Sequence, residues 1–97
     1  MAGFVQVVQF TTSDIGAIEE IADRMREDLG TDFRATRSSV AEDRDRPGNF
    51  MIVAEFDSYE EAMTQSNDPR MGRYSAEMAE HVDGPITFYN LDVKFTN

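Results

Sequence analysis

The sequence predicts an α+β domain in which a four-stranded antiparallel sheet carries two helices. Two segments, 4–10 and 50–56, are apolar on both faces of an extended strand. A continuous apolar run is typical of a strand that is buried on both sides. Between such segments, apolar residues recur at the three- and four-residue spacing of amphipathic helices. The predicted order of elements is strand, helix, strand, strand, helix, strand.

The two apolar strands also predict an assembly. Alternate residues of a strand share a face. In the first segment, one face carries Phe4, Val8 and Phe10 and the other carries Val5 and Val7. In the second, one face carries Ile52 and Phe56 and the other carries Met51 and Val53. Two helices can cover only one face of the sheet. We therefore expect a second copy of the chain to cover the other face, so the sequence predicts a homodimer. The pattern does not show which face meets the partner.

Length and charge narrow the class of protein. A chain of 97 residues is expected to form one domain over 1–97. The formal net charge of −10 disfavours binding to nucleic acid or to anionic lipid. There is no cysteine, which excludes disulfides and thiolate metal sites. No segment reads as a secretory signal or a membrane span, so a cytoplasmic location is expected.

The first half of the chain contains clear element boundaries. A helix is expected from about residue 15 to 29, because N-cap candidates precede it in 11–14 and Gly30 follows it, where a left-handed C-cap belongs. Its buried stripe is Ile15, Ile18, Ala22, Met25 and Leu29. A more polar strand, typical of a sheet edge, is predicted from Phe33 to about Glu42. A turn at Pro47-Gly48 leads to the next strand, from about Asn49 to Phe56.

The second half begins with Ser58-Tyr59-Glu60-Glu61, a capping box that opens the second helix. Asn67-Asp68-Pro69 interrupts that helix, with Asp68 as a new cap and Pro69 as the first residue of the restarted segment. The segment is expected to end at Asp83-Gly84-Pro85, and the last strand to run from about Ile86 to Phe95. The buried stripe of the restarted segment is Met71, Tyr74, Met78 and Val82.

This order of elements is that of the ferredoxin-like unit. With doubly buried strands, the chain resembles the dimeric α/β-barrel superfamily, in which two four-stranded sheets pack face to face. The segment 56–63, Phe-Asp-Ser-Tyr-Glu-Glu-Ala-Met, resembles the "aromatic, acidic, Ser, x, Glu, x, Ala" junction of antibiotic biosynthesis monooxygenase-like proteins. Segments 66–71 and 83–85 fit the same layout. The resemblance covers nearly the whole chain and implies the fold more specifically than the activity.

The resemblance implies a cofactor-independent monooxygenase that acts on a small aromatic or polyketide-type molecule. In such enzymes an electron-rich phenol or anthrone loses a proton, and its anion reacts with oxygen without metal or flavin. The family often has tryptophan where this chain has Phe56, and histidine where it has Gln65. Because the chain has no tryptophan, a haem-degrading role is not expected. We therefore expect no cofactor and no metal.

This chemistry requires an apolar slot, a base and a hydrogen-bond donor or cation. His81 is the first candidate for the base, since imidazole alone among side chains titrates near neutrality without perturbation. It would lie on the margin of the second helix's buried stripe. The alternative interpretation is a half-exposed histidine that interacts with a helix C-terminus. If His81 is the base, its loss is expected to lower the rate by ~10²-fold or more.

Four residues are candidates for substrate binding. Tyr74 could orient a phenolic substrate, although a tyrosine with a buried ring is also ordinary packing. Arg34 and Arg37 lie three apart on the predicted strand and so point to opposite faces, where one could hold an anionic oxygen. Surface ion pairing is the alternative for both. Asn90 interrupts the apolar face of its strand and could donate to a carbonyl.

Two other functions remain open from the sequence. The protein could be a non-catalytic, stress-responsive barrel that binds a small apolar ligand, or a dimeric interaction module with a filled core. A pocket lined by His81, a tyrosine and an arginine or asparagine would favour the enzyme. An apolar pocket without convergent polar groups would favour the binding protein.

Overall fold

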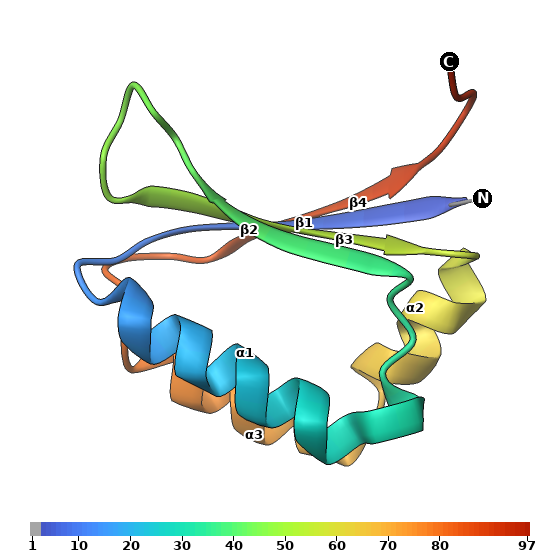
Figure 1. The fold of residues 1–97 in the computed structure, drawn as a ribbon, viewed down its shortest axis with the longest axis horizontal. Helices are drawn as coiled ribbons and strands as arrows, with labels where there is room; N and C mark the ends of the chain where they lie inside the picture. The colour runs from blue at the N-terminus through green and yellow to red at the C-terminus, as the bar shows by residue number, and fades with distance from the viewer. Residues whose placement is uncertain (1–2) are drawn as a thin grey trace.

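The structure, a computed structural model, describes residues 3–97 and consists of a sheet with one layer of helices (Figure 1). The strands are β1 (Phe4–Thr11), β2 (Arg37–Glu42), β3 (Asn49–Phe56) and β4 (Thr87–Asp92). They form an antiparallel sheet in the order β2-β3-β1-β4. The central pair is β1 and β3, the two strands that are apolar on both faces.

The helices all lie against the same face of the sheet (Figure 1). They are α1 (Ile15–Leu29), the short 3-10 helix η1 (Gly30–Asp32), α2 (Tyr59–Ser66) and α3 (Pro69–Ala79). α1 and α3 contact each other side by side. The predicted ferredoxin-like α+β fold is confirmed.

Capping residues begin α1, α2 and α3, and end α1, where the sequence predicts. The Asp14 carboxylate accepts from the backbone N–H of Ala17, and the Ser58 hydroxyl from that of Glu61. Asp68 caps the restarted segment, with Pro69 in its first turn. Gly30 adopts φ 52°, a left-handed conformation that glycine reaches without steric cost.

Two strands have one end at a different residue from the predicted one. β2 begins at Arg37 rather than Phe33, because the backbone N–H of Arg34 donates to Oε1 of Gln65 on α2 at 2.6 Å. β4 ends at Asp92 rather than Phe95, because its only strand neighbour, β1, begins opposite it at Phe4. An edge strand extends only as far as its partner offers hydrogen bonds.

The second helix also ends earlier than predicted. α3 stops at Ala79, so Val82 and His81 lie beyond it instead of on its buried stripe. The backbone N–H groups of Glu80 and His81 bond to carbonyls three residues back, which tightens the final turn. Asp83 then donates its backbone N–H to the carbonyl of Thr11, at the end of β1.

The core consists of two separate clusters on the helix-covered face. Phe4 and Phe56 pack against Ala62 of α2, while Phe10 and Phe50 pack against Ile18 of α1. The rings of Phe10 and Phe50 stack with their centroids 5.8 Å apart. Because the two clusters involve opposite ends of β1 and β3, the middle of the covered face is left for other side chains.

The opposite face of the sheet carries no helix among residues 3–97 (Figure 1). Strand alternation and register place one apolar set on this open face: Val5, Val7, Met51, Val53, Tyr89 and Leu91. Three of them are 40–47% exposed, namely Met51, Tyr89 and Leu91. This open face is the one for which the sequence predicts a partner.

Candidate functional site

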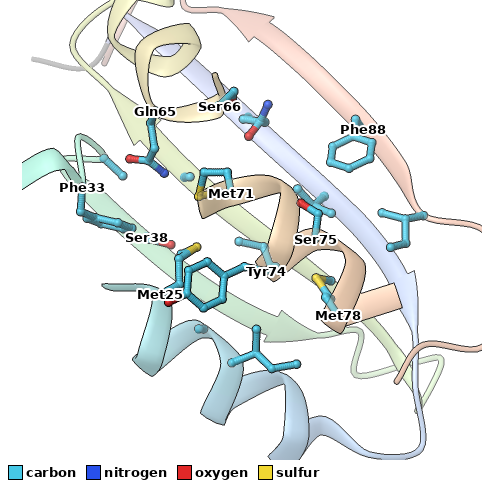
Figure 2. Close-up of a pocket in the computed structure, with 18 of the residues that line it drawn as sticks. Met25, Phe33, Ser38, Gln65, Ser66, Met71, Tyr74, Ser75, Met78 and Phe88 are labelled. Carbon is cyan, nitrogen blue, oxygen red and sulfur yellow. The ribbon is translucent and has the colours of Figure 1, made fainter. Parts of the chain in front are cut away.

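A cavity of about 330 Å³ lies between the middle of the sheet and the helices (Figure 2). This volume is at the lower end of the range typical of small-molecule sites. Strands β1 and β3 provide its floor, and α1 and α3 its outer wall. Most of the lining is apolar, and it includes Val8, Ile18, Met25, Ile52, Met71 and Met78.

A second hollow of about 430 Å³ lies beside the β2–β3 hairpin. Its lining includes Glu42, Asp43 and Arg46, whose side chains already bond within the hairpin. Charged groups that satisfy one another on a loop surface are typical of solvation rather than of ligand binding. The cavity under the helices is therefore the candidate site.

The polar groups of this cavity are neutral. Its lining contains two amides, three hydroxyls of serine and one phenol: Gln6, Gln65, Ser38, Ser66, Ser75 and Tyr74. Within residues 3–97, Tyr74 is the only ionisable residue of the lining. The cavity therefore suits a molecule that is largely apolar and carries a few oxygen atoms.

Tyr74 lines the cavity with its ring (Figure 2), and its role in substrate binding stays a prediction. Its hydroxyl donates to Oδ2 of Asp28 on α1 at 2.6 Å. This hydrogen bond, together with burial and the Asp28 charge, raises the pKa of Tyr74 above its usual value near 10. At neutral pH Tyr74 is therefore a protonated phenol that supplies an apolar wall and ties α3 to α1.

Ion pairs complete the junction of α1 with α3. Arg70 lies 2.7 Å from Asp68 and 2.9 Å from Asp32, and it also donates to the backbone oxygen of Asp28. The bonds from Arg70 lower the pKa of Asp68 to about 2. Farther along, Arg24 bonds to Glu77 and lowers the pKa of that carboxyl. These contacts hold the outer wall of the cavity together.

The structure places His81 in the turn after α3, outside the cavity lining. Its backbone N–H bonds to the carbonyl of Met78, which does line the cavity. Its Nδ1 lies 3.6 Å from Oδ2 of Asp14, and its carbonyl accepts from the hydroxyl of Thr12 at 2.6 Å. The role of His81 as a base stays a prediction.

The two arginines form ion pairs in different places. Arg34, which the sequence places on a strand, lies before β2, and its Nη1 is 2.8 Å from Glu61 on α2. Arg37 begins β2 on the open face, and its Nε is 3.8 Å from Glu55. Neither side chain lines the cavity. A substrate-binding role for either residue stays a prediction.

Asn90 contacts the cavity through a neighbour. It pairs in register with Gln6 of β1, and its Oδ1 accepts from Nε2 of Gln6 at 3.2 Å. Because both groups are amides, the same contact can form with donor and acceptor exchanged. Asn90 therefore influences which end of the Gln6 amide faces the cavity.

Sequence reasoning missed Gln65, which is 7% exposed and lies on α2. It treated this position only as one where the family often has histidine. The available signal was spacing, because Gln65 follows Ala62 by three residues and shares its buried helix face. A polar residue on a buried helix face needs a hydrogen-bond partner.

Two absences hold for residues 3–97. They contain no group of three or more histidine, aspartate or glutamate side chains arranged to hold a metal ion. None of the helices in this part of the chain is both long and apolar enough to cross a membrane.

Comparison with solved structures finds similar folds at low identity. A conserved protein from Methanosarcina mazei Go1 has a TM-score of 0.82 and 9% identity, over 97% of this chain and 95% of that one. SnoaB, a cofactor-independent oxygenase from Streptomyces nogalater, has a TM-score of 0.80 and 11% identity, over 99% and 97%. An antibiotic biosynthesis monooxygenase has a TM-score of 0.72 and 13% identity, over 93% and 97%.

No family model matches the sequence, and no curated protein matches it. At 9–13% identity, these structural likenesses establish the fold alone. The chain has the ferredoxin-like fold of the antibiotic biosynthesis monooxygenase-like proteins.

Proposed function

We propose that the protein binds a small, flat, largely apolar molecule in the cavity and oxygenates it without a cofactor. The observation that carries this proposal is the apolar cavity between helices and sheet, in the fold that SnoaB also has. The balance of atoms and electrons can be written for a methylene flanked by two aromatic rings, as in an anthrone. One atom of O₂ becomes the new carbonyl oxygen and the other leaves as water with the two hydrogens. The four electrons come from the substrate.

In this proposal His81 is the base, while Tyr74, Arg34, Arg37 and Asn90 are the substrate-binding candidates. Tyr74 has the strongest geometric support, because its ring lines the cavity. His81 lies one turn beyond Met78, which lines the cavity. Oxygen uptake should be measured over a panel of hydroquinones and anthrones, first with the wild-type protein.

The role of His81 is then tested with His81→Ala. If the imidazole takes the substrate proton, the rate should fall by ~10²-fold or more. Glu60→Gln is the matched control, because Glu60 is exposed on the first turn of α2 and its loss should leave the rate unchanged. Equal rates in wild type and His81→Ala would contradict the assignment.

A second function is favoured by the neutral lining of the cavity. Tyr74 is its only ionisable residue within residues 3–97, and its phenol is held protonated. A site of this kind suits a non-catalytic protein that binds an apolar ligand. Saturable binding of the panel compounds, without oxygen uptake by any of them, would support this function over the enzymatic one.

A further inference from the structure

The Gln65 amide has one orientation that the surrounding backbone imposes. Its oxygen, Oε1, lies 2.6 Å from the backbone nitrogen of Arg34. A backbone N–H can only donate, so the group facing it must be the amide oxygen and not the NH₂. The assignment of oxygen and nitrogen, which is often ambiguous for glutamine, is therefore determined here by the chain itself.

The fixed oxygen directs the NH₂ group of Gln65 away from Arg34. Figure 2 shows the Gln65 amide between Phe33 and Met71, with its nitrogen on the side of Met71. Both neighbours line the cavity. The hydrogen bonds of residues 3–97 include none from Nε2 of Gln65 to a protein acceptor. The side chain thus presents two N–H donors inside a largely apolar site.

Arg34, whose backbone N–H fixes the Gln65 amide, is itself held in place by an ion pair. The guanidinium of Arg34 bonds to Glu61 at 2.8 Å, one helical turn before Gln65 on α2. Gln65 is only 7% exposed, so its amide has little room to turn. Among residues 3–97, the fully buried side-chain polar atom without a partner is Nε of Arg34, so Nε2 of Gln65 remains accessible from the cavity. A ligand with a hydrogen-bond acceptor at this point can therefore reach it.

We propose that Gln65 selects ligands that carry a carbonyl or phenolic oxygen, by donating a hydrogen bond from Nε2 to that oxygen. This inference rests on the proposed use of the cavity as a ligand site, and it adds the chemical class of the ligand. The cavity lining contains no cationic side chain within residues 3–97, and Gln65 is the neutral donor whose orientation the backbone N–H of Arg34 fixes. Gln6 is less selective, because its pair with Asn90 can form in either direction.

The test uses two ligands with the same three-ring skeleton. Anthrone has a carbonyl where 9,10-dihydroanthracene has a methylene, so their affinity ratio isolates the oxygen contact. Dissociation constants should be measured by fluorescence titration without oxygen. Wild type is expected to prefer anthrone by roughly two- to tenfold, the range of one neutral hydrogen bond. Gln65→Met, which keeps the length and loses the amide, should abolish this preference while its affinity for dihydroanthracene stays within about twofold.

A second variant covers the case in which Gln65→Met does not fold. Gln65→Glu keeps an oxygen that can accept from the N–H of Arg34 but, when ionised, has no donor for the ligand. It should bind anthrone no more tightly than dihydroanthracene above pH 7. Thr64→Ala, an exposed position on α2 outside the cavity lining, is the matched control and should retain the wild-type preference.

The outcomes separate this inference from the proposed function. If wild type binds both compounds and the Gln65 variants retain the anthrone preference, Gln65 is not the selecting residue, although the cavity still binds ligands. If wild type binds neither compound, the cavity is not a ligand site of this class, and both proposals are overturned.

Discussion

The two faces of the sheet are made by the same strands but have different environments. On the face under the helices, Phe4, Phe10 and Phe56 are each 2% exposed. On the open face, Tyr89 and Leu91 are 43% and 47% exposed. The same doubly apolar pattern therefore has two outcomes within one chain. Apolar residues on both faces indicate that both need cover, and the structure shows which face the chain covers by itself.

The largest expected effect is on the open face, where we propose that two copies of the chain meet. Val7 and Val53 lie opposite each other on β1 and β3 in the centre of that face. Val7→Asp or Val53→Asp would bury a carboxylate without a partner in the dimer. We expect at least ~100-fold weaker association, measured by light scattering as a shift from a dimer to an 11.0 kDa particle.

The control for this experiment lies on the other side of the sheet. Val40 of β2 pairs with Ile52, on the helix side, and is already 45% exposed. Val40→Asp should leave the mass unchanged. A wild-type protein that scatters as a single chain at micromolar concentration would contradict the proposed dimer, and the open face would then need another occupant.

The next effect concerns the packed ends of the covered face. Phe4 contacts Phe56 and Tyr59, with ring centroids at 6.4 and 5.4 Å. Phe4→Ala should lower the free energy of unfolding by ~3–5 kcal/mol, the cost of deleting a buried aromatic ring. Phe95, 79% exposed, is the matched control, and Phe95→Ala should change stability by less than ~0.5 kcal/mol. Urea denaturation at constant protein concentration measures both. Similar losses would show that Phe95 is covered in solution.

A smaller effect on stability is expected to distinguish the cavity from the packed core on the same face of the sheet. Ala54 packs against the cluster of Phe4 and Phe56 but also lines the cavity, whereas Ala62 is 0% exposed within that cluster. Ala62→Leu should cost ~1–3 kcal/mol because it overpacks a filled site. Ala54→Leu should cost less than ~1 kcal/mol, since its added atoms enter empty volume, and it should also weaken ligand binding. Equal costs would indicate that the cavity closes in solution.

Much of the fold could be predicted because local chemistry specifies it. Ser58 and Asp68 cap helices through contacts within three residues, and Gly30 supplies a conformation that other residues avoid. The errors occur where a distant group decides the outcome. β2 starts late because the N–H of Arg34 bonds to Gln65, 31 residues away. The residue pattern around Arg34 and the pattern around Gln65 each give no indication of that contact.

The candidate site was less predictable for the same reason. Tyr74 was selected because it belongs to a helical stripe, and its ring lines the cavity. His81 was chosen for its intrinsic pKa, a property of the residue type that carries no information about position. Gln65 has no unusual intrinsic chemistry, and its interest arises only from burial and from the partner of its oxygen. Sites made of neutral amides leave little trace in a single sequence.

The smallest effect concerns the junction of α1 and α3 that forms the cavity's outer wall. Arg70 holds the pKa of Asp68 at about 2, below its ordinary value of 3.8. Because the folded pKa is lowered, Asp68 contributes stability that is fully present above about pH 4. This contribution is lost as the pH falls toward about 2. Asp68→Asn removes the titrating group, so the stability difference between wild type and variant should shrink over this interval.

Chemical denaturation of wild type and Asp68→Asn at several pH values between 5 and 2 measures that difference. The contribution is modest, because both side chains keep some contact with solvent, at 27% exposed for Arg70 and 17% for Asp68. Added salt should reduce it further. Asp45→Asn is the control, because Asp45 is exposed in the β2–β3 hairpin and lies outside this junction. The stability of this variant should follow that of wild type at every pH. A difference that stays constant with pH would show that Asp68 acts only as a helix cap. The outer wall would then depend on the remaining contacts of Arg70 with Asp28 and Asp32, on Tyr74 and on Glu77.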